Sequence, residues 1–345
     1  LNTGISAPRN YSSDKILGIF TKEELKNMAS VPASGSSGAR RPNVIMLQME
    51  SFFDPTLMKG LKFSEDPVPN FRELEKHYST GFLTVPAIGA GTANTEFEVL
   101  SGMSVRFFGP GEYPYKSVLT KKTCETMAYD LKRLGYGTHA IHNHRGAFYG
   151  RNKVFPNLGF DTFTSLEYMN SVSKTPKNWA KDGVLTEEIL AALESTENED
   201  FVYTISVQGH GQYPTEKVIE DPAVTMSGIT AESDANAFEY YLQQVHEMDQ
   251  FIRDLVKALR KFDEPTVLVI YGDHLPGLPI SNSDLENKNV YQTRYVIWDN
   301  FGLKKQDMDL YAYQLGAEVL DRIGVHEGVL TKYHQDHRKD AGYLA

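Results

Sequence analysis

Residues 43–52 read NVIMLQMESF, an apolar run of strand length that ends on a glutamate. Similar short runs, rich in β-branched and aromatic residues, recur along the chain as expected of further strands. With the first, the expected strands span residues 43–49, 137–142, 201–207, 266–271 and 294–298. Because the runs are apolar throughout rather than alternating, both faces of each strand should be covered, as in a mainly parallel sheet.

Segments with helical periodicity separate these strands. They are expected near residues 70–77, 118–134 and 186–193, and the longest runs from about residue 233 to 262. In this last segment apolar residues recur at steps of three and four, which marks one buried face. They are Phe238, Leu242, Val245, Met248, Ile252, Leu255 and Leu259. Alternating strands and helices predict an α/β fold with a central, mainly parallel sheet sandwiched by helices.

Composition excludes some classes of function before any motif is considered. The chain has 345 residues and 41% hydrophobic residues, enough for a substantial core. Its formal net charge of -10 argues against nucleic acid as a partner, since phosphate neutralisation needs a basic surface. Cys124 is the single cysteine, so no internal disulfide can form and the compartment stays open.

The first forty residues are expected to form an arm and linker ahead of one domain at residues 41–345. Thr21 and Glu24 make a capping box for a short helix, and the glycine- and serine-rich residues 32–38 are typical of a flexible joint. No run approaches the roughly 20 apolar residues of a spanning helix. The abrupt start at Leu1 suggests a domain separated from a preceding membrane region.

Two of the expected strands end in metal-binding residue types. Ligands bind outside the carboxyl ends of strands in such sheets. Glu50 follows the first strand, and Asp273 and His274 follow the strand at residues 266–271. Two carboxylates and one imidazole suit Mn²⁺, Mg²⁺ or Zn²⁺. The alternative is that Glu50 caps a helix and the Asp–His pair forms a polar turn.

A glycine-rich segment offers a nucleophile. Residues 87–98 read AIGAGTANTEFE, so Thr92 stands after two glycines at an expected helix start. A threonine there can bind a metal and attack phosphorus, with the helix terminus stabilising the oxyanions. Equally, the segment can be an ordinary capped helix, with Thr92 as N-cap or with Asn94 and Thr95 as turn formers.

Two further loops follow strands directly. Residues 141–152 read IHNHRGAFYGRN, a histidine-, arginine- and aromatic-rich loop that suits a phosphate and a polar headgroup. Residues 207–214 read VQGHGQYP, and a histidine in that place can move a proton. Each histidine taken alone could instead be a satisfied polar residue.

Taken in order, these motifs from about residue 43 to 277 resemble the lipoteichoic acid synthase family of the sulfatase and alkaline phosphatase superfamily. The spacing most resembles the streptococcal branch that adds glycerol phosphate to the group A carbohydrate. The resemblance implies a sulfatase-like α/β domain with a small C-terminal α+β part. It also implies an extracellular location at the cell membrane, behind a bundle of membrane helices.

Carried over residue by residue, the resemblance implies a metal site and a nucleophile. Glu50, Thr92, Asp273 and His274 match the ligands of one Mn²⁺, and Thr92 is also the nucleophile. The expected reaction moves glycerol phosphate from phosphatidylglycerol, through a phospho-threonine, to a sugar hydroxyl of a cell-wall polysaccharide.

The resemblance also assigns the substrate contacts. His142, Arg151 and His210 match phosphate and headgroup contacts, and His210 is our candidate for proton transfer. Tyr149 is expected to bind substrate where the polymerising synthases carry tryptophan, and Gly91 replaces the residue they have before the threonine. Both departures bear on the acceptor rather than on the chemistry.

Several alternatives stand beside this interpretation. One is a polyglycerolphosphate (lipoteichoic acid) synthase or primase, and another is a phosphoethanolamine transferase or phosphodiesterase, although those transferases are usually disulfide-rich. A true sulfatase would need a cysteine or serine in a C/S-x-P-x-R setting, which the segment around Cys124 lacks. An alkaline phosphatase would need a second set of metal ligands. From another class, the domain could be a catalytically inactive wall-binding module.

Overall fold

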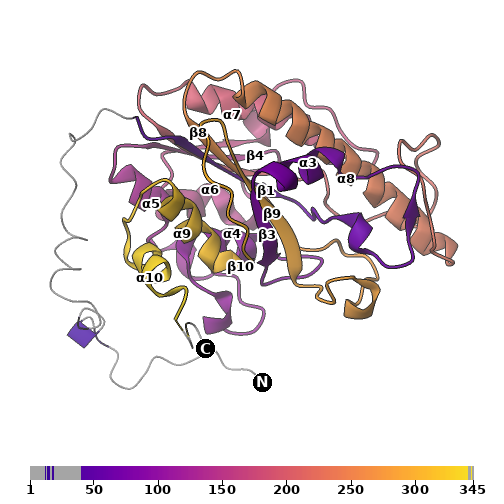
Figure 1. The fold of residues 1–345 in the computed structure, drawn as a ribbon, viewed down its shortest axis with the longest axis horizontal. Coiled ribbons are helices and arrows are strands. Elements are labelled where there is room, and N and C mark those ends of the chain that lie inside the picture. The colour runs from indigo at the N-terminus through magenta and orange to yellow at the C-terminus, as the bar shows by residue number, and fades with distance from the viewer. Residues whose placement is uncertain (1–11, 13, 16–17, 19–39, 341–342, 344–345) are drawn as a thin grey trace.

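A computed structural model describes residues 12, 14–15, 18, 40–340 and 343. The helix expected after Thr21 and the joint at residues 32–38 lie outside the described residues. Residues 40–340 form one α/β domain around an eight-stranded sheet of order β10-β3-β9-β8-β1-β6-β4-β5 (Figure 1). Its strands are β1 (Asn43–Met49), β3 (Ser79–Thr84), β4 (Gly137–His142), β5 (Thr162–Ser165), β6 (Asp200–Ile205), β8 (Thr266–Gly272), β9 (Gln292–Asp299) and β10 (Leu310–Tyr311). A separate antiparallel pair joins β2 (Lys62–Phe63) to β7 (Met226–Ser227).

The sheet is mainly parallel, as predicted. β9 runs antiparallel to both of its neighbours, β8 and β3, whereas the other pairs are parallel. Because β9 is antiparallel to both β8 and β3, the strands β3 and β10 run in the same direction as β8. The carboxyl ends of all these strands except β9 therefore lie along one edge of the sheet.

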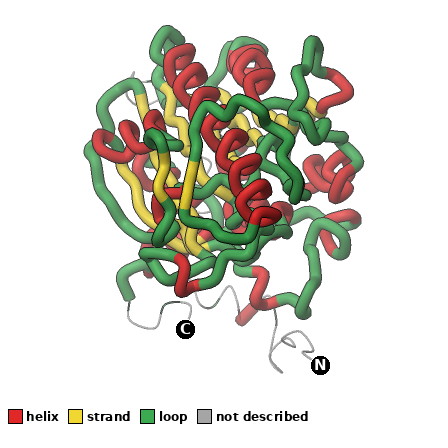
Figure 2. The backbone as a smooth tube through the Cα atoms, turned by 90° about the vertical axis from the view of Figure 1, so that its right-hand side faces the viewer, coloured by secondary structure: helices red, strands yellow, loops and turns green. Residues whose placement is uncertain are grey.

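Helices cover both faces of the sheet, so the strands lie between helical layers (Figures 1 and 2). One layer holds α4 (Thr92–Ser101), α5 (Met127–Lys132), α6 (Arg151–Val154), α9 (Ala312–Arg322) and α10 (Val329–His337). The other holds α3 (Pro69–His77), α7 (Leu185–Leu193) and α8 (Glu232–Leu259). Alternate residues of β1 serve the two layers, because Val44 and Met46 join the core with α4 while Ile45 and Leu47 join the core with α8.

The longest helix, α8, buries the face that was predicted for it, because all seven apolar residues named for residues 233–262 are buried. One prediction is wrong. Residues 118–134 do not form one helix but a 3₁₀ turn at Val118–Thr120 and then α5. Thr126 has an extended backbone and accepts a hydrogen bond from the Ala128 N–H at 3.2 Å, which makes it the N-cap of a new helix.

The C-terminal α+β part continues the same sheet. β10 pairs with β3, and α9 packs against α4 and α10. This arrangement places α9 beside α4, the helix that begins at Thr92.

Candidate active site

The sheet brings the predicted metal ligands to one edge. β1 and β8 are neighbours in register, with Met49 opposite Gly272, so the residues after both strands emerge side by side. A Cβ at Gly272 would lie 1.9 Å from the Phe52 carbonyl oxygen, so only glycine allows this close approach. Glu50 and Asp273 are thereby held next to each other.

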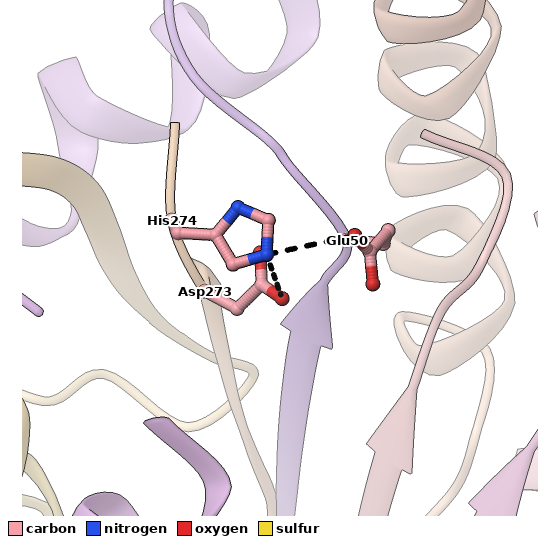
Figure 3. Close-up of side chains that lie close together, drawn as sticks. All are labelled: Glu50, Asp273 and His274. Carbon is pink, nitrogen blue, oxygen red and sulfur yellow. Dashed lines mark ion pairs between the residues drawn. The ribbon is translucent and has the colours of Figure 1, made fainter. Parts of the chain in front are cut away.

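Glu50, Asp273 and His274 converge in space (Figure 3). His274 Nε2 lies 3.4 Å from Asp273 Oδ2 and 3.7 Å from Glu50 Oε1. One ligand atom from each of the three residues lies within 4.8 Å of the others, and all three side chains are buried. The main-chain N–H of Ser51 fixes the second carboxylate by donating to Asp273 Oδ1 at 2.7 Å.

Thr92 completes this cluster. It is the first residue of α4, and Gly91 before it has φ 103°, a left-handed conformation that favours glycine. Thr92 Oγ1 donates to Glu50 Oε2 at 3.0 Å and lies 3.5 Å from His274 Nε2. The alternative hydroxyl of Thr95 is already used, since it donates to the Asp273 carbonyl oxygen at 2.8 Å. Thr92 is therefore the α4 hydroxyl that lies among the acidic and imidazole groups, and the Ser51 hydroxyl next to Glu50 also donates to Glu50 Oε1 at 3.1 Å.

The chemistry of this cluster fits a divalent cation. Asp273 Oδ2 is buried and has no hydrogen-bond partner within the described part of the chain. Burial raises the pKa of Asp273 to about 7, and the Glu50 carboxylate adds to the increase while His274 opposes it. A cation between the carboxylates would remove both the unsatisfied oxygen and the repulsion. Two carboxylates, an imidazole and a hydroxyl form a suitable set of donors.

Other predicted residues surround a cleft of about 390 Å³ that Glu50, Thr92 and His274 also line. Tyr149 and His210 both lie on its wall. The Tyr149 ring stacks on Tyr113 with ring centres 5.6 Å apart. His210 Nδ1 donates to the Gly211 carbonyl oxygen at 2.5 Å, so Nε2 is the ring nitrogen that does not take part in this bond.

The remaining two predicted residues, His142 and Arg151, lie deeper, both of them buried. His142 Nδ1 donates to the Ile205 carbonyl oxygen at 2.8 Å, and burial, reinforced by the Arg151 charge, holds the pKa of His142 well below its ordinary value. Arg151 pairs with the buried carboxylate of Glu96 on α4, with Nε 3.1 Å from Oε2 and a second bond from Nη2 to Oε1. In this structure the Arg151 charge is therefore already matched by a carboxylate.

Sequence patterns missed an aromatic group that joins these residues. The Trp179 ring lies 4.4 Å from that of His210 and 5.5 Å from that of His144, and His144 in turn lies 5.8 Å from His142. Burial lowers the pKa of His144 to about 4, with Arg151 as the next cause. No periodicity marks the loop that carries Trp179, so only the fold reveals its place.

Asp182 was also missed. Its carboxylate is fully buried and accepts hydrogen bonds from Asn143 Nδ2 at 2.9 Å and from the Val207 and Gln208 N–H groups at 3.2 Å each. Asn143 belongs to the loop after β4, and the other two belong to the loop after β6. Asp182 therefore ties together the two loops that carry the site histidines.

Comparisons with known proteins agree with this geometry. The chain matches the family model described as Sulfatase over residues 42–337. It is 30% identical over 354 residues to a "Putative cyclic beta-1,2-glucan modification protein" of Rhizobium meliloti, covering 97% of this chain and 53% of that relative. It is 29% identical over 239 residues to the "Capsular polysaccharide biosynthesis protein RkpI" of the same organism, covering 68% of this chain and 41% of that relative. The chain thus spans about half the length of these curated relatives.

Among solved structures, the fold is similar to that of the Streptococcus pyogenes phosphoglycerol transferase GacH in complex with sn-glycerol-1-phosphate. The TM-score is 0.83 at 22% sequence identity, and the match covers 99% of this chain and 90% of the other. This likeness confirms the predicted fold. Together with the family match over most of the sequence, it shows that the chain belongs to the sulfatase family.

Proposed function

We propose that this chain is the catalytic domain of a phosphotransferase that moves glycerol phosphate from phosphatidylglycerol to a sugar hydroxyl of a cell-surface polysaccharide. The observation that carries the proposal is the Thr92 hydroxyl, 3.0 Å from Glu50 and beside the buried carboxylate of Asp273. A hydroxyl in that place suits attack on phosphorus rather than a structural cap. The structural likeness to a phosphoglycerol transferase agrees with this choice.

The names of the relatives support a polysaccharide as acceptor. One relative is named for glucan modification and another for capsular polysaccharide biosynthesis. A glycan acceptor distinguishes the proposal from a lipoteichoic acid synthase, whose acceptor is a growing glycerol phosphate chain. The intact nucleophile and ligand set argue against an inactive wall-binding module.

The residues that would hold a metal are Glu50, Thr92, Asp273 and His274, and Mn²⁺ is our candidate ion, with Mg²⁺ or Zn²⁺ as alternatives. Such an ion supplies charge that lowers the pKa of the threonine hydroxyl and offsets developing charge on the phosphoryl oxygens. Thr92 Oγ1 attacks phosphorus, its proton leaves through the cleft to solvent, and the bond to the diacylglycerol oxygen breaks. Glycerol phosphate is then esterified to Thr92.

His210 completes the proton balance. Its Nε2 gives a proton to the departing glyceride oxygen and later takes one from the incoming sugar hydroxyl, which attacks the ester. Thr92 Oγ1 then leaves phosphorus and regains its proton from solvent. Neutral His142 and the Glu96-paired Arg151 lie behind the cleft and are our candidates for contacts to the phosphate and headgroup. Tyr149 would bind the headgroup from the cleft wall.

The proposal also includes a location. Residues 41–345 would form an extracellular domain that acts at the outer surface of the cell membrane, where phosphatidylglycerol is available. Among the described residues, no helix has the length and apolar composition to cross a bilayer.

The test is to trap the covalent intermediate. The protein is incubated with Mn²⁺ and phosphatidylglycerol in detergent, without acceptor, and its tryptic peptides are analysed by mass spectrometry. We expect a glycerol phosphate adduct on Thr92, no adduct in Thr92→Ala, and an unchanged adduct in the control Thr95→Val. An adduct on Thr95 or Ser101 would refute the assignment of the nucleophile. Labelling by phosphatidylethanolamine alone would instead indicate a phosphoethanolamine transferase.

A further inference from the structure

A second and larger cleft lies beside the active-site cleft. It has a volume of about 860 Å³ and lies at the same edge of the sheet, over the ends of β3 and β10. Ala90 and Gly91, which lead into Thr92, line both clefts. Tyr113 lines the larger cleft and stacks on Tyr149, which lines the smaller one. The two clefts therefore share one wall, directly next to the nucleophile.

Tyrosine rings form much of the larger cleft, which we call the tyrosine cleft. Tyr291 and Tyr311 line it although their side chains are 46% and 49% exposed. Tyr311 and Tyr313 stack almost parallel, with ring centres 5.2 Å apart and planes 5° apart. Exposed aromatic faces with hydroxyl tips pack well against the C–H faces of sugar rings, because both partners combine an apolar face with polar edges.

Two polar side chains of α4 line the floor. Asn94 Oδ1 is buried and has no hydrogen-bond partner among the residues that the structure describes. The Glu98 carboxylate, 3% exposed, accepts bonds from the Val105 N–H at 2.8 Å and from Ser104 Oγ at 3.1 Å, both through Oε1. A buried acceptor without a partner indicates a ligand that donates hydrogen bonds, as hydroxyl groups do.

Charge favours a neutral ligand over an anionic one. The charged residues that line the cleft are Glu98, Glu112 and Arg106, two carboxylates and one guanidinium. Burial raises the pKa of Glu98 to about 7, and Lys116 Nζ lies 4.7 Å from the centre of the Tyr113 ring, so the lining carries little net charge and does not attract an anion as a basic surface would. The volume lies within the range of about 300–1,000 Å³ that holds drug-sized ligands, so more than one sugar ring can fit.

We propose that the tyrosine cleft binds the acceptor as a neutral oligosaccharide of at least two sugar rings. From there a terminal hydroxyl reaches across Ala90 and Gly91 to the glycerol phosphate ester on Thr92. The hydroxyl oxygen bonds to phosphorus, the bond to Thr92 Oγ1 breaks, the sugar proton leaves to His210, and Thr92 Oγ1 regains a proton from solvent. This inference rests on the proposed function, which it deepens by assigning the acceptor to a site of its own.

The first experiment measures binding alone. Saturation-transfer NMR is recorded with short neutral oligosaccharides of glucose, rhamnose and N-acetylglucosamine, using wild-type protein and the variant Tyr291→Ala with Tyr311→Ala. Both rings are half exposed, so the variant should fold, which its melting temperature checks. The matched control is Tyr168→Ala, whose side chain is 74% exposed and lies outside the cleft. We expect at least one oligosaccharide to bind, with a tenfold or larger loss of affinity in the double variant and wild-type affinity in the control.

The second experiment measures transfer from the preformed Thr92 adduct to the oligosaccharide that binds. Each rate is divided by the same protein's rate of adduct formation, and this ratio should fall at least tenfold in the double variant. The inference is overturned if no oligosaccharide binds, or if the tyrosine substitutions leave both binding and this ratio unchanged. If Thr92 forms no adduct although the tyrosine-dependent binding is present, the proposed transfer fails and the glycan site stands.

Discussion

The buried ion pair between Arg151 and Glu96 allows a direct test of how this site is held together. Both side chains are at most 1% exposed, and the guanidinium makes two bonds to the carboxylate. The substitution Glu96→Gln keeps the shape but leaves the guanidinium without its paired charge in a region that water does not reach. Breaking a buried pair in this way typically costs about 3–5 kcal/mol of stability, because one charge is left uncompensated.

The assay is urea unfolding followed by tryptophan fluorescence, with an exposed pair as control. Glu73 also forms an ion pair, to Lys76 at 2.9 Å, but the two side chains are 59% and 63% exposed. Glu73→Gln should therefore leave the free energy of unfolding close to that of the wild type, because solvent screens an exposed pair.

A double variant separates the charge effect from damage to packing. Glu96→Leu with Arg151→Met removes both charges, so it should be more stable than Glu96→Gln. The argument is refuted if Glu96→Gln loses no more stability than Glu73→Gln. A wild-type rate of adduct formation in a folded Arg151→Met variant would further show that Arg151 holds α4 in place rather than binding phosphate.

Three further outcomes are expected. Elemental analysis should find about one equivalent of divalent metal, lost in Asp273→Ala; full metal content in that variant would place the site elsewhere. His210→Ala should slow attack on phosphatidylglycerol by ~10²–10⁴-fold but slow attack on a nitrophenyl phosphodiester much less, since nitrophenolate leaves without a proton; equal losses would make His210 a binding residue. Burial raises the pKa of Asp182 from 3.8 to about 6, so its contribution to stability is full below about pH 4 and is lost as the pH rises through 6. The unfolding free energy of Asp182→Asn relative to wild type should therefore rise by on the order of 3 kcal/mol between pH 4 and 7, and a flat difference would contradict this.

The strand ends could be predicted from sequence because their signal is local. β1 and β4 were predicted with their observed bounds, and β8 within one residue. Once these runs are taken as parallel strands, their carboxyl ends must meet at one edge. Glu50, Asp273 and His274 then come together without any knowledge of side-chain geometry.

Other parts of the fold depend on contacts that the sequence does not display. β3 reads STGFLT, too mixed to stand out as apolar, and its place is set by pairing with β9 and β10. A Cβ at Gly81 would lie 1.9 Å from the Met308 carbonyl oxygen, a distant segment. β5 is four residues long and likewise has no apolar run that would predict a strand. Because β3 was not predicted from the sequence, the segment before Thr92 could not be placed at the edge of the sheet where Glu50 and Asp273 lie.

Within the site, the side chains that contact each other across the fold could not be predicted from the sequence either. Arg151 was recognised as a phosphate-binding type of residue, but nothing in its neighbourhood along the chain indicates that Glu96 faces it across the core. Trp179 and Asp182 lie in a long loop whose function arises only from where it folds. Positions that follow from a residue's place after a strand were predictable, whereas contacts with a tertiary partner were not.

Helix α4 shows how one short element can serve two clefts. Thr92 and Glu96 are four residues apart and therefore share a face, which carries the proposed nucleophile and holds Arg151. Asn94 and Glu98 share another face, which lines the tyrosine cleft. Because successive residues turn by about 100° around a helix, a shift of two residues separates these faces widely. The proposed donor and acceptor sites are thus fixed to one rigid body, so substitutions at Asn94 or Glu98 should alter acceptor use while leaving the position of Thr92 beside Glu50 and His274 unchanged.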